Sequence, residues 1–393
     1  MLTTLRRSIA IAALIAFPAG AQSTQLTIPS SLSDKAFWQL VTDVSEPGGY
    51  FRSDNFLSNE MGFLYPIPEL KRITKPDGVY LGVGPEQNFT YIAALQPKMA
   101  ILFDIRRQMM LHHLMYKALF ELSSDRADFL SKLFSRARPA GLDSTTNPIK
   151  LFDAYIDTPS DSGAYRRNVI AIKDQLTKKH GFTLTRDDST SLDYVYGAFY
   201  EAGPLINYSF RPGMGAVRFN GERVVLRAAS GDVIGGTVLP MMRGGMANYA
   251  ELQSTTDGAG NYLAFLATEG AFRYVRDMHM RNMIVPVVGN FAGPKAIRAV
   301  GDYLRARNAT VTAFYLSNVE QYLFQQGDDW RKWFENVAAL PLDSASTFIR
   351  SGRGGTSNGV IGLASMIASM QDQVRMYKDG KLLTYVDVIN SSR

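Results

Sequence analysis

The sequence predicts an α/β fold with a mostly parallel sheet and helices on both faces. Residues 79–107 contain a strand, a glycine turn, a helix and a second strand in succession. Residues 283–316 repeat the pattern of strand, helix and strand. The strand segments are continuous apolar runs, which is typical of strands buried on both faces of a parallel sheet. Ligands bind such sheets beyond the carboxyl ends of the strands.

The first unit ends its first strand in Gly82-Val83-Gly84 and continues into a helix. The two glycines allow a ligand to approach the backbone closely, and the start of the helix offers unpaired N–H groups. A third glycine is absent, because Glu86 and Gln87 occupy the positions at which G-x-G-x-G and G-x-G-x-x-G patterns place it. Two interpretations therefore stay open, a nucleotide-type binding turn and an ordinary tight turn.

Asp104 ends the second strand, 22 residues after Gly82. An acidic residue at this spacing accepts hydrogen bonds from a ribose. We expect its carboxylate to face solvent, with Arg106 and Arg107 keeping it ionised or forming a surface ion pair. The candidate cofactor-binding residues are Gly82, Gly84, Glu86, Asn88, Asp104, Arg106 and Arg107.

Later strands also end in small polar residues. Asn290 follows the strand at 283–288 and is the candidate catalytic residue, since a strand-end Asn in an Asn-Pro-Pro-Tyr-like motif binds a substrate amine. The alternative is that Asn290 caps the helix opening at Pro294. Parallel strands would bring these ends to one edge. A polar cluster ahead of the first strand either folds over that edge or is a common polar turn. The candidate substrate residues are Asn59, Glu60, Ser317 and Asn318.

Residues 1–21 have the features of a cleavable signal peptide. Arg6 and Arg7 precede an apolar stretch of 11 residues, and Ala19-Gly20-Ala21 is a small-residue cleavage site. The stretch is too short to span a bilayer. We expect cleavage after Ala21, a periplasmic or secreted protein, and no transmembrane segment in the mature chain.

Composition excludes several classes of protein. The sequence has no cysteine, so it is neither a lipoprotein nor stapled by disulfides. Its formal charge of +6 falls to +4 when the two arginines of residues 1–21 are removed, which does not indicate nucleic-acid binding. No metal-ligand spacing and no G-x-S-x-G nucleophile motif is present, which disfavours hydrolases. The expected partner is a small molecule.

The mature chain, residues 22–393, is predicted to be a single elaborated α/β domain. Its parts are a core at about 50–125 and 182–324, a helical insertion at about 125–180, an irregular insertion at about 203–258 and a C-terminal extension at 325–393. In the irregular insertion the plausible ligand contacts are Tyr208, Arg211, Arg243, Asn248 and Tyr249. Outside the two βαβ units we also expect helices at 33–42, 108–122, 261–280 and 361–376, and strands at 182–185 and 382–388.

Five sequence blocks carry a resemblance to known proteins. They are FLSNE, VYLGVGPEQNFTYIAALQPKMA, DIRRQ, VPVVGNFAGPKAIRAVGDYL and VTAFYLSNVEQYLF, within residues 56–324. The order of elements resembles the Rossmann-like fold of class I S-adenosylmethionine methyltransferases. More closely, the blocks resemble an uncharacterised family of exported bacterial proteins with that core. The resemblance implies that Gly82 and Gly84 form the cofactor turn and that Asp104 binds the ribose. Tyr80 stands where an acidic residue is expected.

Three functions of different classes follow. One is an S-adenosylmethionine-dependent methyltransferase acting on a small or lipid-linked substrate. The second is a non-catalytic periplasmic binder that keeps the fold and its pocket, since S-adenosylmethionine is a cytoplasmic cofactor. The third is an NADP-type oxidoreductase in which Arg106 or Arg107 meets the 2′-phosphate.

Overall fold

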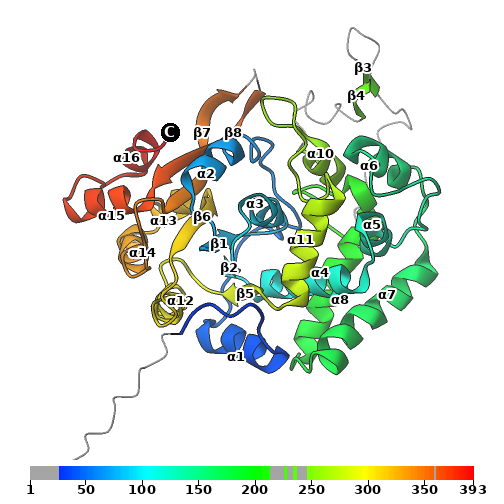
Figure 1. The fold of residues 1–393 in the computed structure, drawn as a ribbon, viewed down its shortest axis with the longest axis horizontal. Coiled ribbons are helices and arrows are strands. Elements are labelled where there is room, and N and C mark those ends of the chain that lie inside the picture. The colour runs from blue at the N-terminus through cyan, green and yellow to red at the C-terminus, as the bar shows by residue number, and fades with distance from the viewer. Residues whose placement is uncertain (1–25, 213–224, 228–232, 237–245, 358–359) are drawn as a thin grey trace, which may run out of the picture.

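The computed structural model describes residues 26–212, 225–227, 233–236, 246–357 and 360–393 (Figure 1). The predicted signal peptide lies outside the described residues. Within them, no helix is both long and apolar enough to span a membrane.

A six-stranded open sheet forms the centre of the fold, with the strand order β5-β2-β1-β6-β7-β8. The first five strands are parallel, and β8 pairs antiparallel with β7. The expectation that the four strands of the two βαβ units belong to one sheet and run parallel is confirmed. The bounds are β1 (Val79–Val83), β2 (Met99–Asp104), β5 (Ile284–Val288), β6 (Val311–Ser317), β7 (Thr347–Ser357) and β8 (Val360–Ser369). Strands β3 (Val225–Arg227) and β4 (Val233–Gly236) form a separate pair.

The direction in which the sheet grows reverses next to β1. From β1 the chain adds β2 and then β5 on one side, and later adds β6 and β7 on the other. The register places Tyr80 between Ala100 of β2 and Ala313 of β6. All residues of β1, β2 and β5 are buried, which explains their continuous apolar runs. The carboxyl ends of the five parallel strands therefore meet at one edge, with the reversal between β1 and β6.

Helices pack on both sides of this sheet (Figure 1). On one side Trp333 packs against Phe291, Phe314 and Phe348. On the other side Phe89 packs against Phe120 and Phe265, among other rings. The helices on the side of Trp333 include α1 (Asp34–Val44), α12 (Ala296–Arg305) and α14 (Asp329–Ala338). The helices on the side of Phe89 include α3 (Gln87–Leu95), α4 (Arg107–Leu122) and α11 (Glu269–Met280).

Shorter helices and the segment after α4 complete the fold. Next to the sheet are α2 (Ile67–Ile73), α13 (Val319–Leu323), α15 (Met370–Lys378) and α16 (Tyr385–Asn390). The layer beyond α4 contains α5 (Arg126–Phe134), α6 (Pro148–Ile156), α7 (Ser162–Asp174), the π-helix η1 (Gln175–Lys179), α8 (Arg186–Ala202), the 3₁₀ helix η2 (Gly203–Leu205) and α10 (Tyr249–Ser254).

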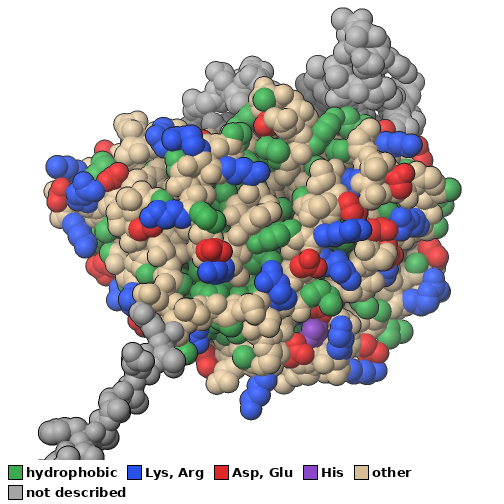
Figure 2. Space-filling model, in the orientation of Figure 1, with side chains coloured by type: hydrophobic (Ala, Val, Ile, Leu, Met, Phe, Trp, Pro, Cys, Tyr) green, Lys and Arg blue, Asp and Glu red, His purple; other side chains and the backbone are tan. Residues whose placement is uncertain are grey.

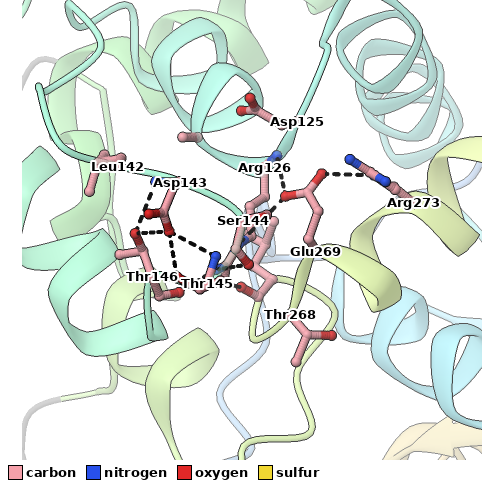
Figure 3. Close-up of polar contacts among 12 residues, drawn as sticks. Asp125, Arg126, Leu142, Asp143, Ser144, Thr145, Thr146, Thr268, Glu269 and Arg273 are labelled. Carbon is pink, nitrogen blue, oxygen red and sulfur yellow. Dashed lines mark hydrogen bonds and ion pairs between the residues drawn. The ribbon is translucent and has the colours of Figure 1, made fainter.

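Arg126, the first residue of α5, ties this layer to the core (Figure 3). Its side chain is 2% exposed, and its Nη1 donates to the carbonyls of Leu266 at 3.0 Å and Ala267 at 2.8 Å. Its Nη2 donates to the carbonyl of Thr146, and its Nε lies 3.7 Å from a carboxylate oxygen of Glu269. One guanidinium thus joins α5, the loop before α6 and the loop that leads into α11.

Four expected elements differ from the structure. Residues 182–185 have no regular secondary structure, and the helix expected at 261–280 begins only at Glu269. The helix expected at 361–376 is wrong in its first part, because residues up to Ser369 pair with β7 as β8. The strand expected at 382–388 is wrong, because α16 begins there. The Thr384 side chain accepts from the Asp387 N–H and Asp387 accepts from the Thr384 N–H, a capping box that starts a helix.

Candidate functional site

A cavity of about 590 Å³ opens at the carboxyl edge of the sheet. Each of four neighbouring strands contributes a lining residue at its carboxyl end: Gly84 after β1, Asp104 at the end of β2, Asn290 after β5 and Ser317 at the end of β6. The cavity therefore lies where the sheet reverses its direction of growth. Asn59, Arg106 and Asn318 also line it, whereas Gly82, Glu86, Asn88, Arg107 and Glu60 are not among its lining residues.

The segment of residues 46–60, here called the strap, covers this edge of the sheet. The Glu46 N–H donates to the carbonyl of Val288 at 2.8 Å, and the Gly49 N–H donates to the carbonyl of Ile105 at 2.6 Å. Further along the strap, the rings of Phe51 and Tyr322 are perpendicular to each other, with centroids 5.4 Å apart. Residues of the strap and of the segment from α13 (Val319–Leu323) to Gln326 thus both line the cavity, and the two segments contact each other through these rings.

Most polar side chains that line the cavity are uncharged. Eight of them are amides: Asn55, Asn59, Gln87, Asn290, Asn318, Gln321, Gln325 and Gln326. Six aromatic residues accompany them: Tyr50, Phe51, Tyr208, Phe291, Tyr315 and Tyr322. The charged lining residues are Arg52, Asp104 and Arg106. Such a lining suits a ligand that has many hydrogen-bonding groups and an apolar or planar part.

The two glycines of the first turn have different roles. At Gly84 φ is +75°, and a Cβ added there would meet no atom within 4 Å. A Cβ at Gly82 would lie 1.9 Å from Oδ1 of Asn88. The buried Asn88 side chain in turn donates to the carbonyls of Val83 at 2.9 Å and Pro85 at 2.7 Å. Gly82 and Asn88 therefore shape the turn by packing, while Gly84 leaves open space beside the cavity.

His113 supports the same turn from α4. Its Nε2 donates to the carbonyl of Gly84 at 2.9 Å, and burial lowers its pKa to about 4. The imidazole is therefore neutral and carries its proton on Nε2.

Glu86 lies behind the turn. The residue is 1% exposed, and burial raises the pKa of its carboxyl to about 8. One of its oxygens accepts the N–H of Ser58 at 3.4 Å, so Glu86 joins the start of α3 to the strap.

Asp104 differs from the sequence expectation, because it is buried instead of facing solvent. Its residue exposure is 6%, and Arg106 binds both carboxylate oxygens at 2.8 Å. The Arg106 backbone N–H adds a third hydrogen bond to Oδ1 at 2.9 Å. Arg107 turns away and pairs with Asp188 of α8 at 2.6 Å. Neither arginine forms a surface pair with Asp104.

Asn290 does not cap the following helix. Its Oδ1 accepts the N–H of Ala292 at 3.0 Å. The helix start is held instead by the strap residue Glu46, whose Oε1 accepts the N–H groups of Lys295 and Ala296, each at 2.8 Å. The other oxygen of Glu46 accepts the Asn290 N–H at 2.9 Å. The strap therefore positions Asn290 in the cavity wall.

Glu60 is buried directly behind the cavity wall, with 1% exposure. One carboxyl oxygen accepts the Ser317 hydroxyl, and the other accepts Nε2 of Gln87 at 3.2 Å. Gln87 Nε2 also donates to the hydroxyl of Tyr315. Burial raises the pKa of Glu60 above the usual value of a glutamate, against the effect of its hydrogen bonds with Ser317 and its other neighbours.

Several lining residues had no interpretable signal in the sequence. In the sequence, Gln87 is notable only for standing where the G-x-G-x-x-G pattern has its third glycine. In the structure, its side chain joins Glu60 to Tyr315. Phe51 and Tyr322 come from distant parts of the chain, yet their rings are in contact and both line the cavity. Of the candidates in the irregular insertion, Tyr208 lines the cavity. Asn248 caps α10, Tyr249 is buried in that helix, Arg211 is not among the lining residues and Arg243 lies outside the described residues.

The fold and the cavity define an α/β protein with a ligand-type pocket at the edge of a mostly parallel sheet. In the part of the chain that the structure describes, no cluster of three or more His, Cys, Asp or Glu is arranged to hold a metal ion. The chain belongs to the family described as Domain of unknown function (DUF7790), which matches residues 56–148 and 236–379. These two segments contain all six strands of the main sheet. No curated protein matches the sequence.

Proposed function

We propose that the protein is an exported binder of a nucleoside-type small molecule, with a Rossmann-like core similar to that of class I methyltransferases. The observation that carries this proposal is the position of the cavity at the point where the strand order reverses, between β1 and β6. Numbered by appearance in the sheet, the strands follow the doubly wound order 3-2-1-4-5-6, and such sheets bind nucleotides in that crevice.

Three features of the cavity support a nucleoside. The open space at Gly84 lets a ligand approach the backbone at the start of α3. Tyr322 and Phe51 offer aromatic surfaces for a base. The amides of the lining offer donors and acceptors for the polar edges of a base and for sugar hydroxyls.

The ribose contact at Asp104 fits only in part. A carboxylate has about four acceptor positions, and Arg106 uses three of them at Asp104. A ribose diol could therefore donate only one hydrogen bond to Asp104 unless Arg106 moved. This supports a binder over an enzyme that clasps S-adenosylmethionine through both ribose hydroxyls.

The other two functions have less support. The predicted signal peptide would take the protein away from cytoplasmic S-adenosylmethionine, which weighs against the methyltransferase. The NADP-type oxidoreductase requires an arginine for the 2′-phosphate, yet Arg106 and Arg107 each hold an aspartate.

Calorimetric titration of the mature protein with S-adenosylhomocysteine, adenosine and NADP tests the proposal. We expect adenosine or S-adenosylhomocysteine to bind, and Tyr322→Ala to weaken binding by about 10- to 100-fold through loss of stacking. Tyr377→Ala is the matched control, because Tyr377 stacks on Phe334 away from the cavity. Mass spectrometry of small molecules that copurify with the protein identifies the natural ligand. If none of the three compounds binds, the proposal is wrong.

A further inference from the structure

The backbone at Ser317 is unusual for a serine. Seven non-glycine residues in the described part of the chain have positive φ. Four are Asn or Asp, which adopt this conformation most readily, and two, Gln96 and Ser135, are helix C-caps. Ser317, with φ +51°, belongs to neither group. It lies at the turn from β6 into α13, where the pairing with β7 has a register shift between Tyr315 and Ser317.

This geometry directs the Ser317 side chain. Bulges next to functional sites commonly re-aim a side chain, and strained residues concentrate at such sites. Ser317 lines the cavity, and its hydroxyl donates to the carboxyl of Glu60. A serine on a sharp strand-to-helix turn is also the arrangement that presents a nucleophile in α/β enzymes. The sequence lacks the G-x-S-x-G pattern, so only the structure reveals this turn.

Glu60 is a buried acid, and its side-chain hydrogen bonds with described residues have neutral partners, among them Ser317 and Gln87. Burying a carboxyl group without a positively charged partner costs free energy. The presence of such a group beside a cavity therefore points to a chemical role. Gln87 and Tyr315 fix the far oxygen, so the near oxygen stays directed at the Ser317 hydroxyl. A nucleophilic hydroxyl needs an adjacent base held in this way.

We propose that Ser317 is a nucleophile and Glu60 its base, acting on a carboxylic ester of a small molecule in the cavity. This goes beyond the proposed binding function, and it rests on the cavity admitting a small ligand. The amide side chains of Asn59 and Asn318 line the same cavity and supply neutral donors for the ester's carbonyl oxygen.

The reaction uses only the protein, the ester and water. The Ser317 Oγ attacks the carbonyl carbon as its proton passes to Glu60. The C–O bond to the alcohol then breaks, and the alcohol leaves with the proton from Glu60. Water next attacks the acyl carbon and gives a proton to Glu60, which returns it to Ser317 Oγ as the carboxylic acid is released. No cofactor is consumed, which suits a protein exported from the cytoplasm.

Labelling with diisopropyl fluorophosphate tests the proposal without knowledge of the natural ester. Ser317 Oγ would displace fluoride from phosphorus, and peptide mass spectrometry would locate the adduct. We expect labelling of Ser317 in the wild-type protein and none at this position in Ser317→Ala. In Glu60→Gln we expect a rate lower by about 100-fold or more, since general bases contribute about 10²–10⁴-fold. Glu251→Gln is the control, because Glu251 also has a raised pKa, of about 7, but its carboxyl accepts the N–H of Asn248 at the start of α10 and not the hydroxyl of Ser317.

Two results would overturn the proposal: no labelling of Ser317, or equal rates in the wild type and in folded Glu60→Gln. If Glu60→Gln does not fold, the pH profile of wild-type labelling decides, because the rate must rise as a single carboxyl group ionises. Failure of the nucleoside-binding proposal can be distinguished from failure of this one. If labelling depends on Glu60 but adenosine, S-adenosylhomocysteine and NADP do not bind, the binding proposal is wrong and the assignment of Ser317 and Glu60 holds.

Discussion

The guanidinium of Arg106 binds both carboxylate oxygens of Asp104, with Nε–Oδ1 and Nη2–Oδ2 distances of 2.8 Å each. Both side chains are less than a tenth exposed. Arg106 Nη1 also donates to the carbonyl of Ser53, so the pair links the end of β2 to the strap. The carboxylate expected to serve a ligand thus also supports the wall of the cavity.

Replacing Asp104 by alanine should lower the free energy of unfolding by about 3–5 kcal/mol, because it leaves Arg106 buried without its counter-charge. Urea denaturation measures the loss. Asp379→Ala is the control, since its pair with Lys381 is exposed and 3.5 Å long and its backbone has an ordinary φ of -77°, and it should cost less than about 1 kcal/mol. Similar losses in both variants would mean that the Asp104–Arg106 pair is not a structural unit.

The buried carboxyl of Glu86 should make stability depend on pH. Its pKa is raised from 4.5 to about 8, so between these values the folded protein keeps a proton that the unfolded chain has lost. Stability contributed by this group therefore falls as pH rises from about 4.5 to 8. Glu86→Gln removes this loss. The quantity to compare is the free energy of unfolding of Glu86→Gln minus that of the wild type. We expect this difference to be larger at pH 8 than at pH 5 by at least about 1 kcal/mol.

Glu69→Gln is the control for that experiment. Hydrogen bonding from Arg72 lowers the pKa of Glu69 below 4.5, so this group is ionised in both states above pH 5. Denaturation curves at several pH values should show no change in its difference from the wild type. A flat difference for Glu86→Gln as well would contradict the prediction.

The buried pair of Glu320 and Arg350 should control both stability and ligand affinity. Arg350 Nε lies 2.7 Å from Glu320, both side chains are at most 2% exposed, and Trp333 Nε1 donates to the same carboxylate at 3.2 Å. Glu320 belongs to α13, whose Gln321 and Tyr322 line the cavity. Glu320→Ala should cost about 3–5 kcal/mol of stability and weaken ligand binding.

Glu335→Ala is the matched control, since its pair with Arg298 is about half exposed at 3.4 Å. We expect little change in thermal unfolding or in calorimetric affinity for this variant. Loss of stability in Glu320→Ala without any change in affinity would show that α13 is positioned independently of the pair.

The mature protein should begin at Gln22 in the periplasm. The positive start, the short apolar stretch and the Ala19-Gly20-Ala21 site form the basis of this prediction. N-terminal sequencing of protein from a periplasmic extract measures it. An intact Met1 in the cytoplasmic fraction would contradict it and would strengthen the methyltransferase alternative.

The sequence predicted the central strands well because their signals are local. The runs around Leu81, Ile101 and Val285 are buried on both faces, and each unit carries its own helix and turn. Residues 382–388 favour a strand through their β-branched residues, although the helix α16 begins among them. A local signal for this helix is present, because Thr384 and Asp387 have the spacing of a capping box. In contrast, β8 depends on pairing with β7, which no local pattern specifies.

Side-chain contacts within the site were beyond local reasoning. Asp104 and Arg106 are two residues apart, and whether they pair depends on the strap that buries them. Glu60 and Ser317 are 257 residues apart in the sequence, yet they share a hydrogen bond. Strand ends therefore indicated where the site lies, while the roles of individual residues required the fold.

The contacts of Glu46 have a consequence for the order in which the chain folds. This carboxylate near the start of the strap is satisfied by N–H groups of Asn290, Lys295 and Ala296. In the same way, Val79 of β1 pairs with Val311 of β6. Contacts so distant in sequence form late and slow folding. Before the C-terminal half is synthesised, one edge of β1 is therefore unpaired and the Glu46 end of the strap lacks its partners. The cavity takes shape only once β6 has joined the sheet.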